Sequence, residues 1–229
     1  GTFWSPKGKL LAFYRMDQSM VTDYPQVNTA ARIAVLEPDK YPMAGMTSHK
    51  VTIGIYNPAT RQTIYLQTGD PTDRYFTNLA WSPDELHLYV IELNREQNQA
   101  QLVRYDAVSG EKEAVLLEET HPKYVEPLHP IVFVPWNQHQ FIYQSQRDGF
   151  NHLYLYDTTG KCIKQLTKGD WVVQDIVGFN SKTKEAIVMT TEISPLQSNA
   201  YAVDITNGNR RLIGVGKGVH HVKLSTEGD

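Results

Sequence analysis

The stretch Trp81-Ser82-Pro83-Asp84-Glu85-Leu86-His87-Leu88-Tyr89-Val90-Ile91 decides the fold that the sequence predicts. Trp-Ser-Pro is typical of the end of a β-strand, because proline has no amide hydrogen for further ladder bonding. Asp84 and Glu85 then form a turn. Leu86, Leu88 and Val90 alternate with residues expected to be exposed, as in a second strand.

The same corner returns along the chain. A clear copy begins at Trp4, and weaker copies begin at Phe133, at Phe179 and at Leu224, the last running to Asp229. An aromatic-rich strand, a turn with Asn, Asp or Gly, and another strand follow the corners. These second halves occupy residues 51–66, 102–111, 152–167 and 200–213. Two strands at the corner and two in the second half give four per repeat, the pattern of a β-propeller blade.

The spacing of the corners supports this interpretation. Trp81, Phe133, Phe179 and Leu224 follow one another at intervals of 52, 46 and 45 positions. Blade repeats in known propellers are roughly 40–50 residues long. The sequence therefore predicts an all-β fold of about four blades, each with four antiparallel strands.

The first blade contains an insertion. Trp4 and Trp81 are 77 positions apart, and the additional residues are placed at 16–50. Its Asp23-Tyr24-Pro25 and Tyr41-Pro42-Met43-Ala44-Gly45 stretches form turns and do not fit a central strand. The insertion is predicted either to build a binding surface, as loops on rigid scaffolds often do, or to cover a blade edge.

No linker interrupts the repeats, so residues 1–229 are predicted to form a single, partial propeller domain. The chain opens in an inner strand, and residues 220–225 are predicted to form another. Two arrangements fit: four blades closed by terminal strands in one shared sheet, or an arc of a larger ring. The arc is favoured, because a propeller chain seldom starts on a strand-ending turn. An arc leaves strand edges exposed, so self-association is expected.

Composition excludes several partners. A formal net charge of −3 without a basic cluster argues against nucleic acid and anionic membranes. No apolar run approaches the length of a transmembrane helix.

The lone Cys162 lies in a strand-like run and is predicted to be a small core residue. Only Glu113–Glu119 has helical spacing, and that short stretch is ambiguous.

The sequence contains no recognisable catalytic or cofactor motif. It lacks the Gly-x-Ser-x-Gly nucleophile elbow, His-Glu-x-x-His and Cys-x-x-Cys. Gly214-Val215-Gly216-Lys217-Gly218 resembles a nucleotide-binding loop, but no helical pattern follows it. His220 and His221 are adjacent and would point to opposite faces of a strand. No catalytic residue, metal site or cofactor is therefore predicted.

Specific residues nevertheless resemble one family. The segments that match the propeller of the dipeptidyl peptidase IV family, in the same order, are Phe3–Asp17, Tyr41–Gly45, Val51–Tyr56, Glu126-Pro127, Arg147–Tyr154 and Leu166–Val173. This family belongs to the prolyl oligopeptidase clan of serine peptidases. The resemblance covers nearly the whole chain and is greatest to bacterial members, including prolyl tripeptidyl aminopeptidases of the Bacteroides type.

The resemblance implies an eight-bladed propeller on an α/β-hydrolase domain that carries a Ser-Asp-His triad. It also implies peptide substrates with proline near the N-terminus, and a periplasmic or secreted parent protein. The hydrolase domain is absent here, and the family's paired glutamates would precede residue 1. The segment before Glu126-Pro127 corresponds to a cavity-facing loop. Lys123 and Tyr124 are therefore candidate substrate-binding residues, and an exposed pair without that role is the alternative.

Two functions follow from these observations. The first is a non-catalytic propeller portion of a serine exopeptidase, which gates access and completes the substrate cavity. Its peptide partner would be bound together with the missing hydrolase domain. The alternative is a stand-alone propeller that binds a protein partner through its loops.

Overall fold

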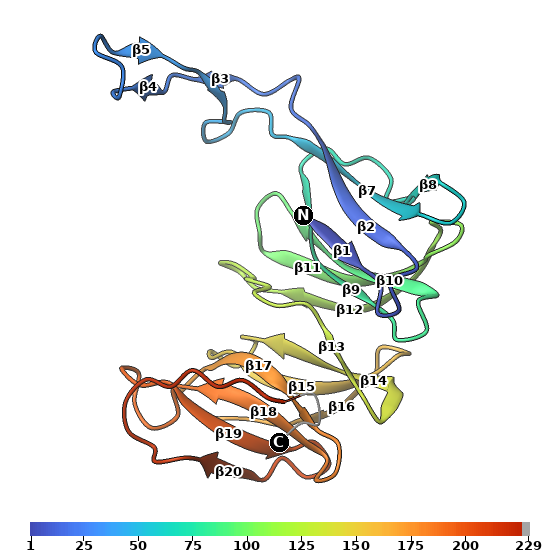
Figure 1. Cartoon of the computed structure of the whole chain (residues 1–229), viewed down its shortest axis with the longest axis vertical. Coiled ribbons are helices and arrows are strands. Elements are labelled where there is room, and N and C mark those ends of the chain that lie inside the picture. The colour runs from blue at the N-terminus through green and yellow to red at the C-terminus, as the bar shows by residue number, and fades with distance from the viewer. Residues whose placement is uncertain (226–229) are drawn as a thin grey trace.

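The computed structural model describes residues 1–225, which form β-strands and connections without any helix (Figure 1). None of these residues therefore belongs to a helix that could cross a membrane. The main strands form four four-stranded sheets. In chain order these are β1 (Thr2–Trp4), β2 (Leu11–Asp17), β7 (Lys50–Asn57) and β8 (Gln62–Tyr65); β9 (Arg74–Trp81), β10 (His87–Asn94), β11 (Gln99–Asp106) and β12 (Lys112–Thr120); β13 (Val132–Val134), β14 (Asn137–Ser145), β15 (His152–Asp157) and β16 (Cys162–Gln165); β17 (Val173–Asn180), β18 (Glu185–Thr190), β19 (Asn199–Asp204) and β20 (Arg210–Ile213).

Each sheet is an antiparallel meander of strands that are consecutive along the chain, apart from the insertion in the first. The sheets follow one another as blades, as the colour order in Figure 1 shows. The predicted all-β propeller architecture of four-stranded blades is confirmed. No sheet in the described residues combines strands from the first blade with strands from the fourth.

The blades are held together by apolar side chains on both faces of their central strands. Leu88 and Val90 of β10 pack in a cluster with the first blade, whereas Tyr89 and Ile91 pack in a cluster with the third. The predicted alternation of buried and exposed residues is therefore wrong for this strand. A neighbouring blade covers each face of β10, so all four side chains are buried. Leu86 is 53% exposed because it lies in the turn before β10.

The Trp-Ser-Pro corner also connects blades through hydrogen bonds. The indole N–H of Trp81 donates to the carbonyl of Phe3 at 3.0 Å. The Ser5 hydroxyl and the Lys7 amide donate to the Glu85 carboxylate at 2.6 and 2.8 Å. The repeated sequence motif thus attaches the second blade to the equivalent corner of the first.

The repeated turn glycines have a packing function. Each lies at positive φ between the third and fourth strands of its blade and meets the backbone of the preceding blade. A Cβ atom added at these glycines would approach a carbonyl oxygen to 2.5 Å (Gly110 to Tyr65), 2.1 Å (Gly160 to Leu116) or 2.8 Å (Gly208 to Leu166). Only glycine combines this conformation with so close an approach.

The insertion forms an arm that projects from the first blade (Figure 1). It contains two short ribbons, which pair β3 (Asp23–Tyr24) with β6 (Asp39–Lys40) and β4 (Val27–Asn28) with β5 (Val35–Leu36). We name residues 18–49 the arm, since β2 and β7 pair as far as Asp17 and Lys50. Residues 16, 17 and 50 of the predicted 16–50 insertion therefore belong to β2 and β7.

The base of the arm is attached to the second blade. Arg95 donates to the Met46 carbonyl at 2.7 Å and pairs with Asp73 at 3.1 Å. This links the base to the turn between β10 and β11 and to the connection that precedes β9. The arm is therefore anchored where it leaves the blades.

Three further sequence predictions are resolved by the structure. Cys162 is exposed, not buried, because β16 is the last strand of its sheet. The ambiguous segment Glu113–Glu119 lies in β12 and is not helical. Residues 220–225 form no strand, and the isolated bridge between Ser198 and Val219 ends just before them.

The last predicted corner is described only in part. Residues 226–229 of the Leu224–Asp229 copy lie outside the described residues. Leu224 itself packs on Gly178 of β17, where an added Cβ atom would approach its side chain to 2.7 Å.

Candidate functional site

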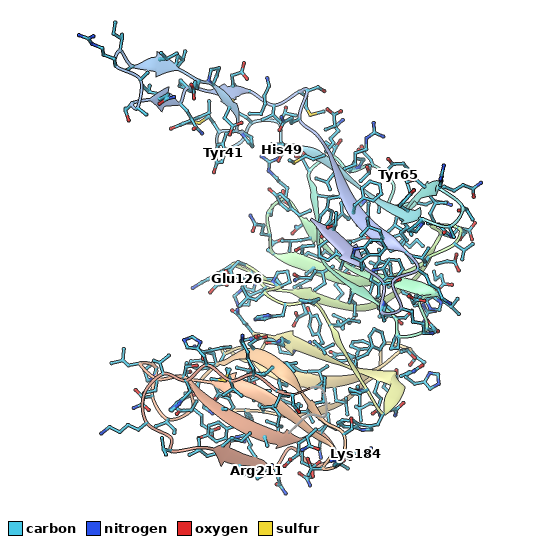
Figure 2. The ribbon with its side chains drawn as sticks, in the orientation of Figure 1. Tyr41, His49, Tyr65, Glu126, Lys184 and Arg211 are labelled. Carbon is cyan, nitrogen blue, oxygen red and sulfur yellow. The ribbon has the colours of Figure 1, made fainter. Side chains whose placement is uncertain are left out.

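The meander places a defined set of connections at one end of the blades. In such a sheet, the connection between the second and third strands and the connection to the next sheet lie at the same end. We call this end the arm rim. It includes the arm, residues 66–73, residues 121–131, residues 146–151 and residues 166–172. Figure 2 shows Tyr41, His49 and Glu126 on the side from which the arm projects, and Lys184 away from them.

The 121–131 loop connects β12 to β13 and carries both predicted site residues. Its first turn is formed around His121, whose Nδ1 accepts hydrogen bonds from the amides of Lys123 and Tyr124 at 3.1 and 3.3 Å. The His121 and Tyr124 rings lie 6.0 Å apart in an edge-to-face arrangement. The backbone of the two candidate residues is thus fixed, while both side chains are exposed.

A small cavity lies between this loop and the third blade. Its volume is about 80 Å³, and it is lined by residues 119–121, 124–126 and 144–147. Tyr124 lines the cavity and is 56% exposed, whereas Lys123 does not line it. The structure therefore separates the two predicted residues: Tyr124 borders a cavity and Lys123 projects elsewhere. The substrate-binding role of both stays a prediction.

Arg147 is the central charge of this cavity. Its Nε lies 3.1 Å from the Glu119 carboxylate, and its guanidinium donates to the Tyr156 hydroxyl at 2.8 Å. The same group lies 4.3 Å above the centre of the Tyr154 ring. Burial disfavours the charged guanidinium, but the Tyr156 hydrogen bond and Glu119 outweigh it, so the pKa of Arg147 lies above its ordinary value. Arg147 is therefore permanently charged.

Glu119 is held in place by donors from the third blade. It accepts hydrogen bonds from the Tyr143 hydroxyl at 2.7 Å and from the Ser145 hydroxyl. Burial raises the pKa of Tyr143 well above its ordinary value, and the neighbouring carboxylate raises it further. The phenol therefore remains a donor, and β12 is joined to β14.

This arrangement can bind and orient a ligand. The Ser145 hydroxyl donates to Glu119, but Arg147 pairs with the same carboxylate oxygen, so this hydroxyl belongs to the ion-pair network. The floor is a neutralised ion pair, and the rim presents the Tyr124 ring and the exposed Glu126. In the part of the chain that the structure describes, no group of three His, Cys, Asp or Glu residues could hold a metal ion.

A buried hydroxyl–imidazole pair elsewhere is structural. The Thr167 hydroxyl lies 3.0 Å from His152 Nδ1 and accepts the amide hydrogen of Leu153. Since Thr167 then donates to Nδ1, His152 Nε2 carries the proton and donates to the Gly169 carbonyl at 2.9 Å. His152 is fully buried and Thr167 is 2% exposed, so no substrate reaches them.

Sequence reasoning missed Glu119 and Arg147. Arg147 lies in a segment that resembles the family, Arg147–Tyr154, but nothing in the sequence indicated its partner. The available signal was an arginine that lies close in sequence to Tyr154 and Tyr156, two tyrosines at alternating positions of one strand.

Comparison with known proteins identifies the family. A model of the dipeptidyl peptidase IV N-terminal region matches residues 1–229. The chain belongs to this family. Its resemblance to the dipeptidyl peptidase IV propeller, inferred above from short motifs, is thereby confirmed.

Individual relatives of this dipeptidyl peptidase IV N-terminal region agree. The structure of a candidate dipeptidyl aminopeptidase IV from Bacteroides ovatus has a TM-score of 0.91 and 53% identity over the whole chain, which spans 35% of that protein. Dipeptidyl peptidase 4 from Porphyromonas gingivalis has a TM-score of 0.79 and 28% identity. That match covers 92% of this chain and 30% of the Porphyromonas protein. A candidate dipeptidyl-aminopeptidase B from Phaeosphaeria nodorum is 26% identical over 93% of the chain and 26% of its own length. The chain thus spans between a quarter and about a third of these relatives.

Proposed function

We propose that this chain is the non-catalytic propeller portion of a serine exopeptidase that cleaves peptides after a proline near their N-terminus. The observation that carries the proposal is the Tyr124–Arg147 cavity at the arm rim, in a chain of the dipeptidyl peptidase IV N-terminal family. In the complete protein, this chain would form half of an eight-bladed ring above a hydrolase domain. The ring would gate access, and the 121–131 loop would complete the substrate cavity.

The chemistry of the cavity supports a binding role. A peptide in the cavity would meet a phenol ring with a polar tip at Tyr124 and a carboxylate at Glu126. Lys123 would add a point charge outside the cavity. The Glu119–Arg147 pair keeps the floor rigid and neutral, so it favours orientation of a ligand over chemical reaction with it.

The test uses the complete gene product. Its reading frame is expected to encode Gly-x-Ser-x-Gly downstream of residue 229, and a reading frame that ends near Asp229 would contradict the proposal. The 229-residue chain alone should not hydrolyse a chromogenic peptide that contains proline. Turnover by this chain would show that the reacting groups lie within it.

The loop is tested by substitution in the complete protein. Tyr124→Ala is expected to raise KM several-fold with little change in kcat, since it removes binding without touching the reacting atoms. Tyr124→Phe keeps the ring and removes the hydroxyl, so it separates the contributions of these two groups to binding. Lys123→Ala is compared with Lys182→Ala, an exposed lysine on the opposite rim. Equal kinetics for all four variants would refute the role of the loop.

A stand-alone protein-binding propeller is the second candidate, favoured by exposed apolar side chains on the arm. These are Val27, Ile33, Val35 and Leu36, which are between 50% and 82% exposed. A complete reading frame of about this length and a protein partner lost on deletion of the arm would support it. The family resemblance also supports a periplasmic or secreted parent, which cell fractionation would test.

A further inference from the structure

Asn78 interrupts the regular geometry of β9. Its φ is 54°, in the left-handed region, although it lies within the strand Arg74–Trp81. The other five non-glycine residues with positive φ in residues 1–225 all lie outside the strands. Such a conformation inside a strand is strained and persists only where the surroundings stabilise it.

The same residue is part of a β-bulge. Tyr89 of β10 faces Ala80, but Ile91 faces Thr77, so the two residues Asn78 and Leu79 oppose the single residue Val90. Bulges of this kind redirect a side chain away from the regular alternation of a strand. The redirected side chain here is the Asn78 amide.

The Asn78 amide points to the candidate site loop. Its Nδ2 donates to the carbonyl of Pro127 at 2.7 Å. Apart from the bonds of the strand ladders, this is the only hydrogen bond that residues 126–131 make in the described chain. The first half of the loop is attached through backbone groups instead, since His121 and Val125 donate to the carbonyls of Asn98 and Gln97 at 3.0 and 2.7 Å.

We propose that Asn78 is the positioning residue of the 121–131 loop, and that its bulge directs an amide donor that sets Tyr124 and Glu126 at the cavity. That the loop binds a peptide rests on the proposed function. The attachment itself rests only on the bulge and on the Pro127 hydrogen bond.

Asparagine suits this position for two independent reasons. It tolerates the left-handed conformation better than most residues other than glycine. It also carries an N–H donor, which the Pro127 carbonyl requires. Glycine would keep the backbone and lose the donor, while aspartate would place a negative oxygen opposite the carbonyl.

Hydrogen exchange of the 229-residue chain tests the attachment without any peptide. Asn78→Gly is expected to leave the fold intact and to accelerate exchange of the His121 and Val125 amides about three- to tenfold, as loss of one hydrogen bond predicts. Asn78→Asp should accelerate them at least as much. Arg61→Gly is the matched control, because Arg61 has a φ of 59° in a turn on the opposite rim.

Unchanged exchange of these two amides in both Asn78 variants would overturn the proposal. So would equal acceleration across the whole chain, or unfolding by Asn78→Gly, since either would assign Asn78 to general stability. In the complete enzyme, Asn78→Gly should raise KM and leave kcat unchanged. If the wild-type protein does not cleave proline-containing peptides, the proposed function fails, but the exchange result still decides the role of Asn78.

Discussion

Glu92 provides a quantitative test of how a buried carboxylate holds the strands of the second blade together. Its carboxylate is only 5% exposed, in β10. It accepts hydrogen bonds from the Arg74 guanidinium and the Tyr105 hydroxyl, and Lys112 Nζ lies 3.5 Å away. Burial raises the pKa of Tyr105, and the hydrogen bond to Glu92 raises it further, so the phenol stays a donor.

The substitution Glu92→Gln keeps the shape of the side chain and removes its charge. Removing one partner of a fully buried ion pair costs about 3–5 kcal/mol. Here Arg74 and Lys112 remain 28% and 36% exposed, so water relieves part of the unpaired charge. We expect the free energy of unfolding to fall by about 2–3 kcal/mol, and Tm to fall by roughly 4–12 °C.

Glu185→Gln is the matched control, because the change is chemically identical. Its partner Arg211 is 59% exposed, so the expected cost is below about 1 kcal/mol. Differential scanning calorimetry of the 229-residue chain measures both variants. A Tm for Glu92→Gln within about 2 °C of the control would refute the argument that burial makes this pair important. Adding Tyr105→Phe should cost less in the Glu92→Gln background than in the wild type, since the two groups interact.

Further predictions concern individual residues and the whole chain. Gly160→Ala should destabilise by at least about 2 kcal/mol more than Gly149→Ala, since both have positive φ but only Gly160 contacts a neighbouring backbone; equal losses in chemical denaturation would contradict this. The Ser109 amide, which donates to Asp106, holds the pKa of that carboxyl below its ordinary value of 3.8. Its stabilisation is present above pH 3.8 and is lost as the pH falls through the lower folded value, so Asp106→Asn should flatten the fall of Tm in acid. Cys162 should react with a thiol reagent in the folded chain as fast as in urea, and strong protection would show that it is buried. Light scattering should show a mass that rises with concentration, and the mass of one chain throughout would argue against self-association.

The repeated corner was sufficient to predict four-stranded blades, because proline and turn residues act locally. Burial was predicted less well. The sequence of β10 alternates Leu88 and Val90 with Tyr89 and Ile91, and all four are apolar, which could indicate a strand covered on both faces. The exposure of Cys162 depends on which strand is outermost, and strand propensity does not contain that information.

The candidate site was only partly accessible from sequence. The family resemblance located the loop with Tyr124, but not the cavity beneath it. Glu119 and Arg147 belong to different blades and meet only because the sheets stack. The strained backbone of Asn78 could not be predicted either, because a single asparagine in a strand-like run does not indicate a left-handed conformation.

The turn glycines have a consequence for how such a chain can change in evolution. At these three turns the polypeptide touches the preceding blade directly, and a side chain in place of Gly110, Gly160 or Gly208 would not fit. The arm is instead inserted between the second and third strands of the first blade. Lengthening of the chain is therefore disfavoured at the three glycine turns, whereas the connection between β2 and β7 accommodates the whole arm and the surface that it adds.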